Sequence, residues 1–211
     1  NMIGTFNQPV QVIIDTKFLK SLSKLEIQCG LMEVIKHGLI SDKSFFVWLE
    51  KNLKQILSLK PQFIERAIKR SIEIKADVVS KDEKENGLRA ILNFGHTFGH
   101  ALETIGNNKL YTHGEAVALG MLAATKLSES ISDLDPKVFD RVHSTIKNTG
   151  IKVKLKKKIF PKKLIKLMQS DKKKNNSQLK FILLEKIGKA KIKSVSNEVT
   201  IENAIKNSLF Y

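Results

Sequence analysis

The chain has 211 residues and one cysteine, Cys29, so it is long enough to bury a core and cannot form an internal disulfide. No apolar run has the length of a membrane span, or of a signal-peptide core with a basic flank. These features exclude a disulfide-stapled scaffold and a membrane-spanning protein, and they predict a soluble protein of the cytoplasm.

The formal net charge is +16, and most of it comes from one part of the chain. Residues 151–193 contain sixteen lysines but only two acidic residues, Asp171 and Glu185. A basic stretch can bind nucleic acid through the phosphates. This one has only two aromatic residues, Phe160 and Phe181, to serve as stacking platforms for bases. We therefore favour a solvated, lysine-rich surface over a nucleic-acid site, with some lysines meeting an anionic small molecule.

A strand and three helices are predicted first. Residues 10–15 form a short β-branched run, which predicts a strand whose sheet lies elsewhere. Apolar residues three and four apart predict a helix over residues 24–39. Asp42 is a suitable cap for a second helix, and Pro61 suits the first turn of a long third helix that ends near Lys81.

The rest of the chain also has mostly helical patterns. Helices are predicted over residues 88–105, 114–130, 136–149 and 161–170, and alternating residues predict a β-hairpin over 179–195. No repeat or linker divides the chain. The pattern predicts one mainly helical domain over residues 1–211, with a short N-terminal strand and a C-terminal hairpin.

Histidines are the first candidates for chemistry. His96 and His100 lie four apart on a predicted helix, so both rings share one face and could chelate a divalent metal, although such pairs also occur as independent residues. Thr97 stands where the glutamate of an H-E-x-x-H metalloprotease would be, which disfavours a protease. His113 follows a short loop that can fold it back toward the pair.

An acidic side chain could complete such a metal site. Glu33 on an earlier helix would supply the carboxylate of a zinc site with an open position, or it could form a surface ion pair with Lys36. Gly95 and Gly99 flank His96, and glycines inside a helix cost stability unless another group approaches closely.

Candidate anion-binding groups lie near the histidines. Lys75, Arg89 and Asn93 fall on or beside the same predicted helices and together could hold a phosphate or carboxylate, although each lysine alone also suits a solvated surface. The sequence contains neither a G-x-G-x-x-G motif nor a P-loop. Nothing in this chain is therefore expected to cradle a dinucleotide.

Residues 87–103, G-L-R-A-I-L-N-F-G-H-T-F-G-H-A-L-E, closely resemble the signature of the 3-dehydroquinate synthases. The blocks at residues 1–9, 30–38, 75–83 and 113–118 resemble the same family in the same order. The resemblance implies the helical C-terminal half of a two-domain enzyme whose N-terminal domain binds NAD. On this resemblance the chain starts where the family chain leaves that domain, so the NAD-binding domain is expected to be absent here.

The resemblance also implies the roles of individual residues. Glu33, His96 and His113 would bind zinc, or cobalt in its place, while His100 would handle a proton or orient the substrate. Other contacts to the anionic sugar-phosphate substrate would come from the following residues: Lys36 and Lys75, both also catalytic, Arg89, Asn93, Asn1, and Lys172 or Lys173. His37 and His143 match no site position.

Enzymes of this family convert 3-deoxy-D-arabino-heptulosonate 7-phosphate to 3-dehydroquinate and phosphate in the shikimate pathway, which leads to the aromatic amino acids. The resemblance implies this NAD- and zinc-dependent lyase activity, a homodimer, and no turnover by this chain alone. Two alternatives stay open: another sugar-phosphate cyclase similar to 2-deoxy-scyllo-inosose synthase, and a non-catalytic fragment that binds nucleic acid.

Overall fold

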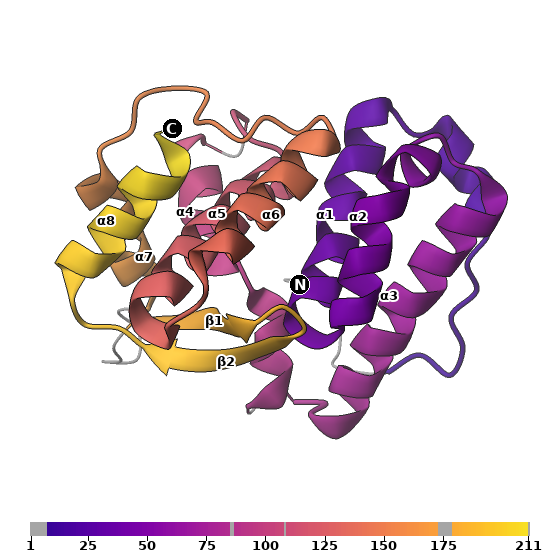
Figure 1. Ribbon diagram of the computed structural model, residues 1–211, viewed down its shortest axis with the longest axis horizontal. Coiled ribbons are helices and arrows are strands. Elements are labelled where there is room, and N and C mark those ends of the chain that lie inside the picture. The colour runs from indigo at the N-terminus through magenta and orange to yellow at the C-terminus, as the bar shows by residue number, and fades with distance from the viewer. Residues whose placement is uncertain (1–7, 85–86, 108, 173–178, 211) are drawn as a thin grey trace.

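Helices make up most of the computed structural model, which describes residues 8–84, 87–107, 109–172 and 179–210 (Figure 1). They are α1 (Lys24–Ser41), α2 (Lys43–Leu57), α3 (Pro61–Lys81), α4 (His96–Ile105), α5 (His113–Ser132), α6 (Pro136–Asn148), α7 (Pro161–Lys172) and α8 (Glu198–Leu209). Two 3-10 helices, Thr16–Ser21 and Leu88–Asn93, and the strands β1 (Lys180–Lys186) and β2 (Lys189–Ser194) complete the described elements. The predicted mainly helical fold with a C-terminal hairpin is confirmed.

Helix α5 is the central element of the core. It is buried on every side from Gly114 to Thr125 and contacts α1, α4, α6, α8 and β1. In Figure 1 it lies in the middle of the molecule, with α1, α2 and α3 on one side and α7 and α8 on the other. Its many alanines let these neighbours pack closely, because a helix buried all round needs small side chains where other helices cross it.

Helices α4 and α5 approach each other closely. A Cβ atom at Gly99 would lie 3.2 Å from the carbonyl oxygen of Ala116, and Gly95 meets Gly120 and Met121. Gly95 also has a φ of +82°, which favours glycine. The helix predicted over residues 88–105 is therefore wrong as one unit, because the left-handed turn at Gly95 separates the 3-10 helix Leu88–Asn93 from α4.

Most helix ends coincide with the sequence signals. Ser23 and Glu26 form a capping box at α1, Asp42 caps α2, and Pro61 begins α3. A second capping box, Thr112 with Glu115, begins α5 at His113. These two capping boxes fix the start of α1 and α5, two of the three helices that carry candidate metal ligands.

The hairpin has the predicted antiparallel pairing, with Phe181 opposite Lys193 and Ile182 opposite Ile192. Its turn docks on the helices, because the N–H of Gly188 donates to the carbonyl of Leu39 at 2.8 Å. Strand β1 is mostly buried, and β2 is mostly exposed. The hairpin thus closes one edge of the helical core.

Two other predictions need correction. Residues 10–15 form no strand; the segment pairs with no strand of the described residues, and Val10 and Ile13 are highly exposed. Helix α8 was not predicted, although Asn197 caps it and its apolar residues recur at helical spacing. No helix in the described part of the chain is long and apolar enough to cross a membrane.

Candidate metal centre and active site

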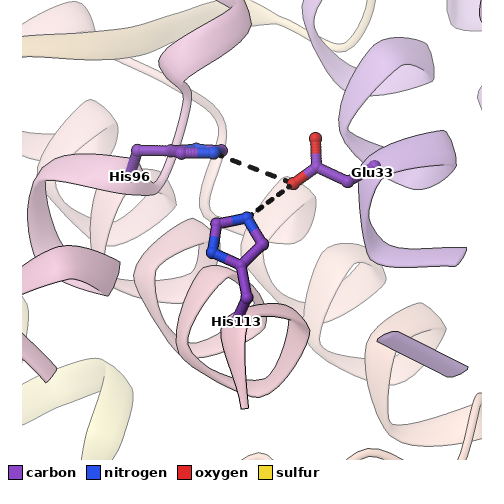
Figure 2. Close-up of side chains that lie close together, drawn as sticks. All are labelled: Glu33, His96 and His113. Carbon is purple, nitrogen blue, oxygen red and sulfur yellow. Dashed lines mark ion pairs between the residues drawn. The ribbon is translucent and has the colours of Figure 1, made fainter. Parts of the chain in front are cut away.

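Three side chains from different helices converge at one point (Figure 2). Oε1 of Glu33 on α1 lies 3.8 Å from Nε2 of His96 and 3.6 Å from Nε2 of His113. The two histidines are the first residues of α4 and α5, so the close contact between these helices brings their rings together, with ring centroids 5.4 Å apart. One donor atom from each of the three residues lies within 4.8 Å of the other two.

The donor set fits a transition metal. A tetrahedral zinc ion with bonds of about 2.0–2.1 Å holds its ligand atoms about 3.4 Å apart, slightly less than the spacing seen here. Oε1 of Glu33 is buried and has no hydrogen-bond partner, an arrangement that is costly unless a cation completes it. One carboxylate and two imidazoles also leave a fourth position open for a substrate oxygen.

Burial and nearby charges lower the pKa values of Glu33 and His96, which favours the deprotonated forms that bind a metal. Burial opposes ionisation of Glu33, but the ammonium group of Lys36, with smaller effects of His96 and His113, holds the pKa of the carboxyl below its usual value. Burial and the charge of Lys36 lower the pKa of His96 to about 4, so the ring is neutral at pH 7. A metal ligand must be in this deprotonated form.

The second nitrogen of each imidazole also has a partner. Nδ1 of His96 lies 3.3 Å from the carbonyl oxygen of Phe94, and Nδ1 of His113 lies 3.1 Å from Oε1 of Glu103. Such partners fix which nitrogen carries the proton and leave the other nitrogen's lone pair for the metal. Sequence spacing nominated His96 and His100 as the metal pair, but His100 is not a member of the three-residue cluster.

A pocket of about 310 Å³ adjoins the cluster, and four of the predicted substrate residues line it. The lining consists of Glu33, Lys36, His37, Lys75, Arg89, Leu92, Asn93 and His96. Lys36 is only 3% exposed, and burial lowers the pKa of its ammonium group despite the opposing effect of Glu33. Three cationic side chains around one pocket suit an anionic ligand.

His100 lines a different pocket, of about 410 Å³, between α4 and α7. Its ring meets that of His96 edge to face, with centroids 5.5 Å apart, so His100 lies beside the three-residue cluster. Lys172 is the last residue of α7. Asn1 and Lys173 lie outside the described residues.

Two groups near the cluster escaped the sequence analysis. Glu103 lies on the same face of α4 as His96, seven residues later, and this spacing could have indicated it. Lys156 donates to the carboxylate of Glu115 at 2.7 Å and to the carbonyl of Leu110 at 2.8 Å. Lys156 thereby stabilises the loop and the helix cap that precede His113. These contacts are long-range, and no sequence pattern predicts them.

The chain resembles curated proteins over most of its length. It is 43% identical over 198 residues to the 3-dehydroquinate synthase of Thermoanaerobacter pseudethanolicus. This match covers 94% of the chain but 55% of the relative. The chain therefore spans about half the length of the curated relative it matches.

Solved structures share the fold. The 2-epi-5-epi-valiolone synthase of Streptomyces hygroscopicus subsp. jinggangensis, with NAD+ and Zn2+ bound, matches with a TM-score of 0.82 at 23% identity, over 92% of this chain and 54% of that one. A 2-deoxy-scyllo-inosose synthase complexed with carbaglucose-6-phosphate, NAD+ and Co2+ matches with a TM-score of 0.79 at 25% identity, over 92% of this chain and 56% of that one.

A family model also matches the part of the chain that contains the candidate site. The model described as the C-terminal domain of 3-dehydroquinate synthase matches residues 30–174, well over half of the chain. This segment includes all three residues of the candidate metal centre and both pockets described above. The chain therefore belongs to the 3-dehydroquinate synthase C-terminal family.

Proposed function

We propose that this chain is the metal- and substrate-binding half of a 3-dehydroquinate synthase, which converts 3-deoxy-D-arabino-heptulosonate 7-phosphate to 3-dehydroquinate and phosphate. The observation that carries the proposal is the buried, unpartnered Oε1 of Glu33, which faces two imidazoles at the edge of a cation-lined pocket. The 43% identity to an enzyme of that name, over most of this chain, supports the choice of reaction.

Glu33, His96 and His113 would hold the zinc ion, with cobalt as a possible substitute. When bound, zinc supplies a Lewis acid at the substrate's hydroxyl or ketone oxygen, while NAD supplies the hydride chemistry. The chain's own residues bind and orient the substrate. Lys36 and Lys75 line the pocket as catalytic and binding groups and offset the negative charge of the substrate.

The remaining side chains complete the proposed contacts. Arg89 and Asn93, in the same pocket, hold the substrate's carboxylate or hydroxyl groups. His100, beside His96, exchanges a proton with the substrate through a ring nitrogen or orients it. Asn1 and a lysine at position 172 or 173 are assigned to the phosphate on family resemblance alone.

A separate NAD-binding domain is part of the proposal. The sequence has no glycine-rich dinucleotide motif, and the chain spans about half of its relative. The apolar side chains of Val12, Ile13 and Phe18 are exposed and suit a surface covered by further protein. We assign this surface to the NAD-binding domain and propose that the complete enzyme is a cytoplasmic homodimer.

Loss of a proposed ligand tests the assignment in the complete enzyme. Glu33→Gln and His113→Ala should each abolish both zinc retention and turnover, because each removes one of three protein ligands. Metal content after dialysis and phosphate release from the sugar phosphate measure the two effects. Full activity with unchanged metal content in either variant would falsify the ligand assignment.

A second cyclase reaction is the nearest rival. The chain shares its fold, and 25% sequence identity, with a 2-deoxy-scyllo-inosose synthase. The same metal-binding residues could therefore serve a reaction on a related sugar phosphate. Product analysis of the complete enzyme, with each candidate sugar phosphate supplied separately with NAD, decides between them. Formation of a carbocyclic inosose instead of 3-dehydroquinate would replace the proposed reaction.

A further inference from the structure

Glu103 contacts His113, one of the three residues of the cluster, but is not itself a member of the cluster. Its Oε1 lies 3.1 Å from Nδ1 of His113, whereas Nε2 of the same ring lies 3.6 Å from Oε1 of Glu33. The imidazole of His113 therefore bridges two carboxylates, one at each nitrogen. Only the Nε2 side faces the point where the three donor atoms converge.

His113 needs such a support more than His96 does. The side chain of His113 is 53% exposed, against 13% for His96, although each residue begins its helix, so the ring of His113 has less packing around it. The ring of His96 is held by burial and by the carbonyl of Phe94. An exposed imidazole without a partner loses rotamer freedom when it binds a metal, and this loss weakens binding.

Glu103 is itself placed by the helix that carries His96. The two residues are seven apart on α4, which is about two helical turns, so they lie on one face of the helix. The side chain of Glu103 is only 20% exposed. Helix α4 thus supplies one proposed ligand, His96, and contacts a second, His113, through the carboxylate of Glu103.

We propose that Glu103 is a positioning residue for the metal centre: it accepts the Nδ1–H of His113 and so directs Nε2 toward the metal. The proposal rests on the metal site of the proposed function. With Glu103 as acceptor, the proton of the neutral ring stays on Nδ1, and the negative charge makes Nε2 a stronger donor. Removing this partner should weaken the metal site without removing a ligand.

The test measures metal affinity in the complete enzyme, by competition between the protein and a chelator for Zn2+. Glu103→Ala should raise the zinc dissociation constant about 10- to 100-fold. Glu103→Gln keeps an oxygen that accepts from Nδ1–H but loses the charge, so it should recover part of the affinity. The absorption spectrum of the Co2+-loaded Glu103→Ala enzyme should also change, because the geometry of one ligand changes.

Glu202 provides a matched control. Its side chain is 21% exposed and pairs with Lys206 at 2.8 Å on α8, away from the cluster. Glu202→Ala should leave the zinc affinity and the cobalt spectrum unchanged. Unfolding of the metal-free proteins shows whether Glu103→Ala is folded, and Glu103→Gln supplies the comparison if it is not.

Two outcomes would overturn the proposal in different ways. Wild-type zinc affinity in Glu103→Ala, with an unaltered cobalt spectrum, would show that His113 is oriented without the carboxylate, while the metal site itself stands. Absence of zinc binding by the wild-type enzyme would remove the metal site and, with it, the role of Glu103. The two failures are thus distinguishable by the wild-type measurement alone.

Discussion

Nδ1 of His37 lies 2.6 Å from the hydroxyl oxygen of Ser71, where α1 packs against α3. Both side chains are buried, and the contact ties the helix of Glu33 and Lys36 to the helix of Lys75. His37 also lines the cation-rich pocket. A residue that matches no site position by sequence therefore helps to fix the two lysines relative to each other.

The pH dependence of stability should reveal the burial of His37. Burial, with a smaller effect of Lys36, lowers its pKa to about 4, below the value of about 6.5 in an unfolded chain. Between these values the unfolded state binds more protons, so the free energy of unfolding falls as the pH drops from 7 toward 4. His37→Gln should reduce this loss by roughly 1–3 kcal/mol. Urea unfolding of the metal-free protein at several pH values measures it, and an unchanged pH slope in the variant would contradict the argument.

Zinc should stabilise the folded chain through the three-residue cluster. A ligand that binds only the native state, at 100 times its dissociation constant, adds about 2.7 kcal/mol. For a protein of this size, each kcal/mol raises Tm by roughly 2–4 °C. Thermal unfolding with zinc, and then with excess chelator, should show a rise that the chelator reverses. The rise should be absent in His113→Ala; an equal rise there would place the zinc elsewhere.

The glycine contact between α4 and α5 should be sensitive to a single methyl group. A Cβ atom at Gly95 would lie 2.7 Å from the backbone nitrogen of Met121, at a φ of +82°. Gly95→Ala should therefore cost about 2–4 kcal/mol and weaken zinc binding, because His96 follows directly. Denaturant unfolding and chelator competition measure the two effects.

Gly30 is the control for that substitution. It lies within α1, and a Cβ atom there would meet nothing within 4 Å. Gly30→Ala should stabilise the chain by about 0.5–1 kcal/mol, because alanine favours a helix interior. If Gly95→Ala were as stable as Gly30→Ala, the close approach of the two helices would be wrong.

Lys156 should stabilise the start of α5. The carboxylate of Glu115 is 8% exposed and would lose a charged partner in Lys156→Met. We expect a loss of about 1–3 kcal/mol and weaker zinc binding through His113. The neighbouring Lys157 makes only a 3.4 Å contact to a carbonyl, so Lys157→Met should change stability by less than about 0.5 kcal/mol. Equal effects of the two substitutions on unfolding would rule out the bracing role.

The sequence predicts those features that depend on local patterns. Apolar spacing, the cap residue Asp42 and the first-turn proline Pro61 locate the helices, because these signals act within a few residues. The break at Gly95 depends on α5, which is distant in the chain, and so it lay beyond a periodic pattern. The unpaired segment at residues 10–15 kept its strand composition without a partner to pair with.

The candidate site divides in the same way. Helical spacing alone favoured His96 with His100, since both lie on one face of α4. Bringing His113 to His96 instead requires the loop before α5 to turn back and the two helices to touch, which is tertiary information. Family resemblance carried that information indirectly, but it did not indicate Glu103. Helical spacing places Glu103 on the same face as His96, and only the structure shows its contact to His113.

The three donor side chains belong to three helices, and Glu33 lies about sixty residues before His96 in the sequence. An unfolded chain must close that long loop before the carboxylate meets the imidazoles, at a cost in chain entropy. High-affinity metal binding by this proposed site would thus be a late event in folding, after α1 has docked on α5. An incompletely folded chain would bind zinc only weakly. Once bound, the ion would link α1 to α4 and α5 and slow the local unfolding of α1.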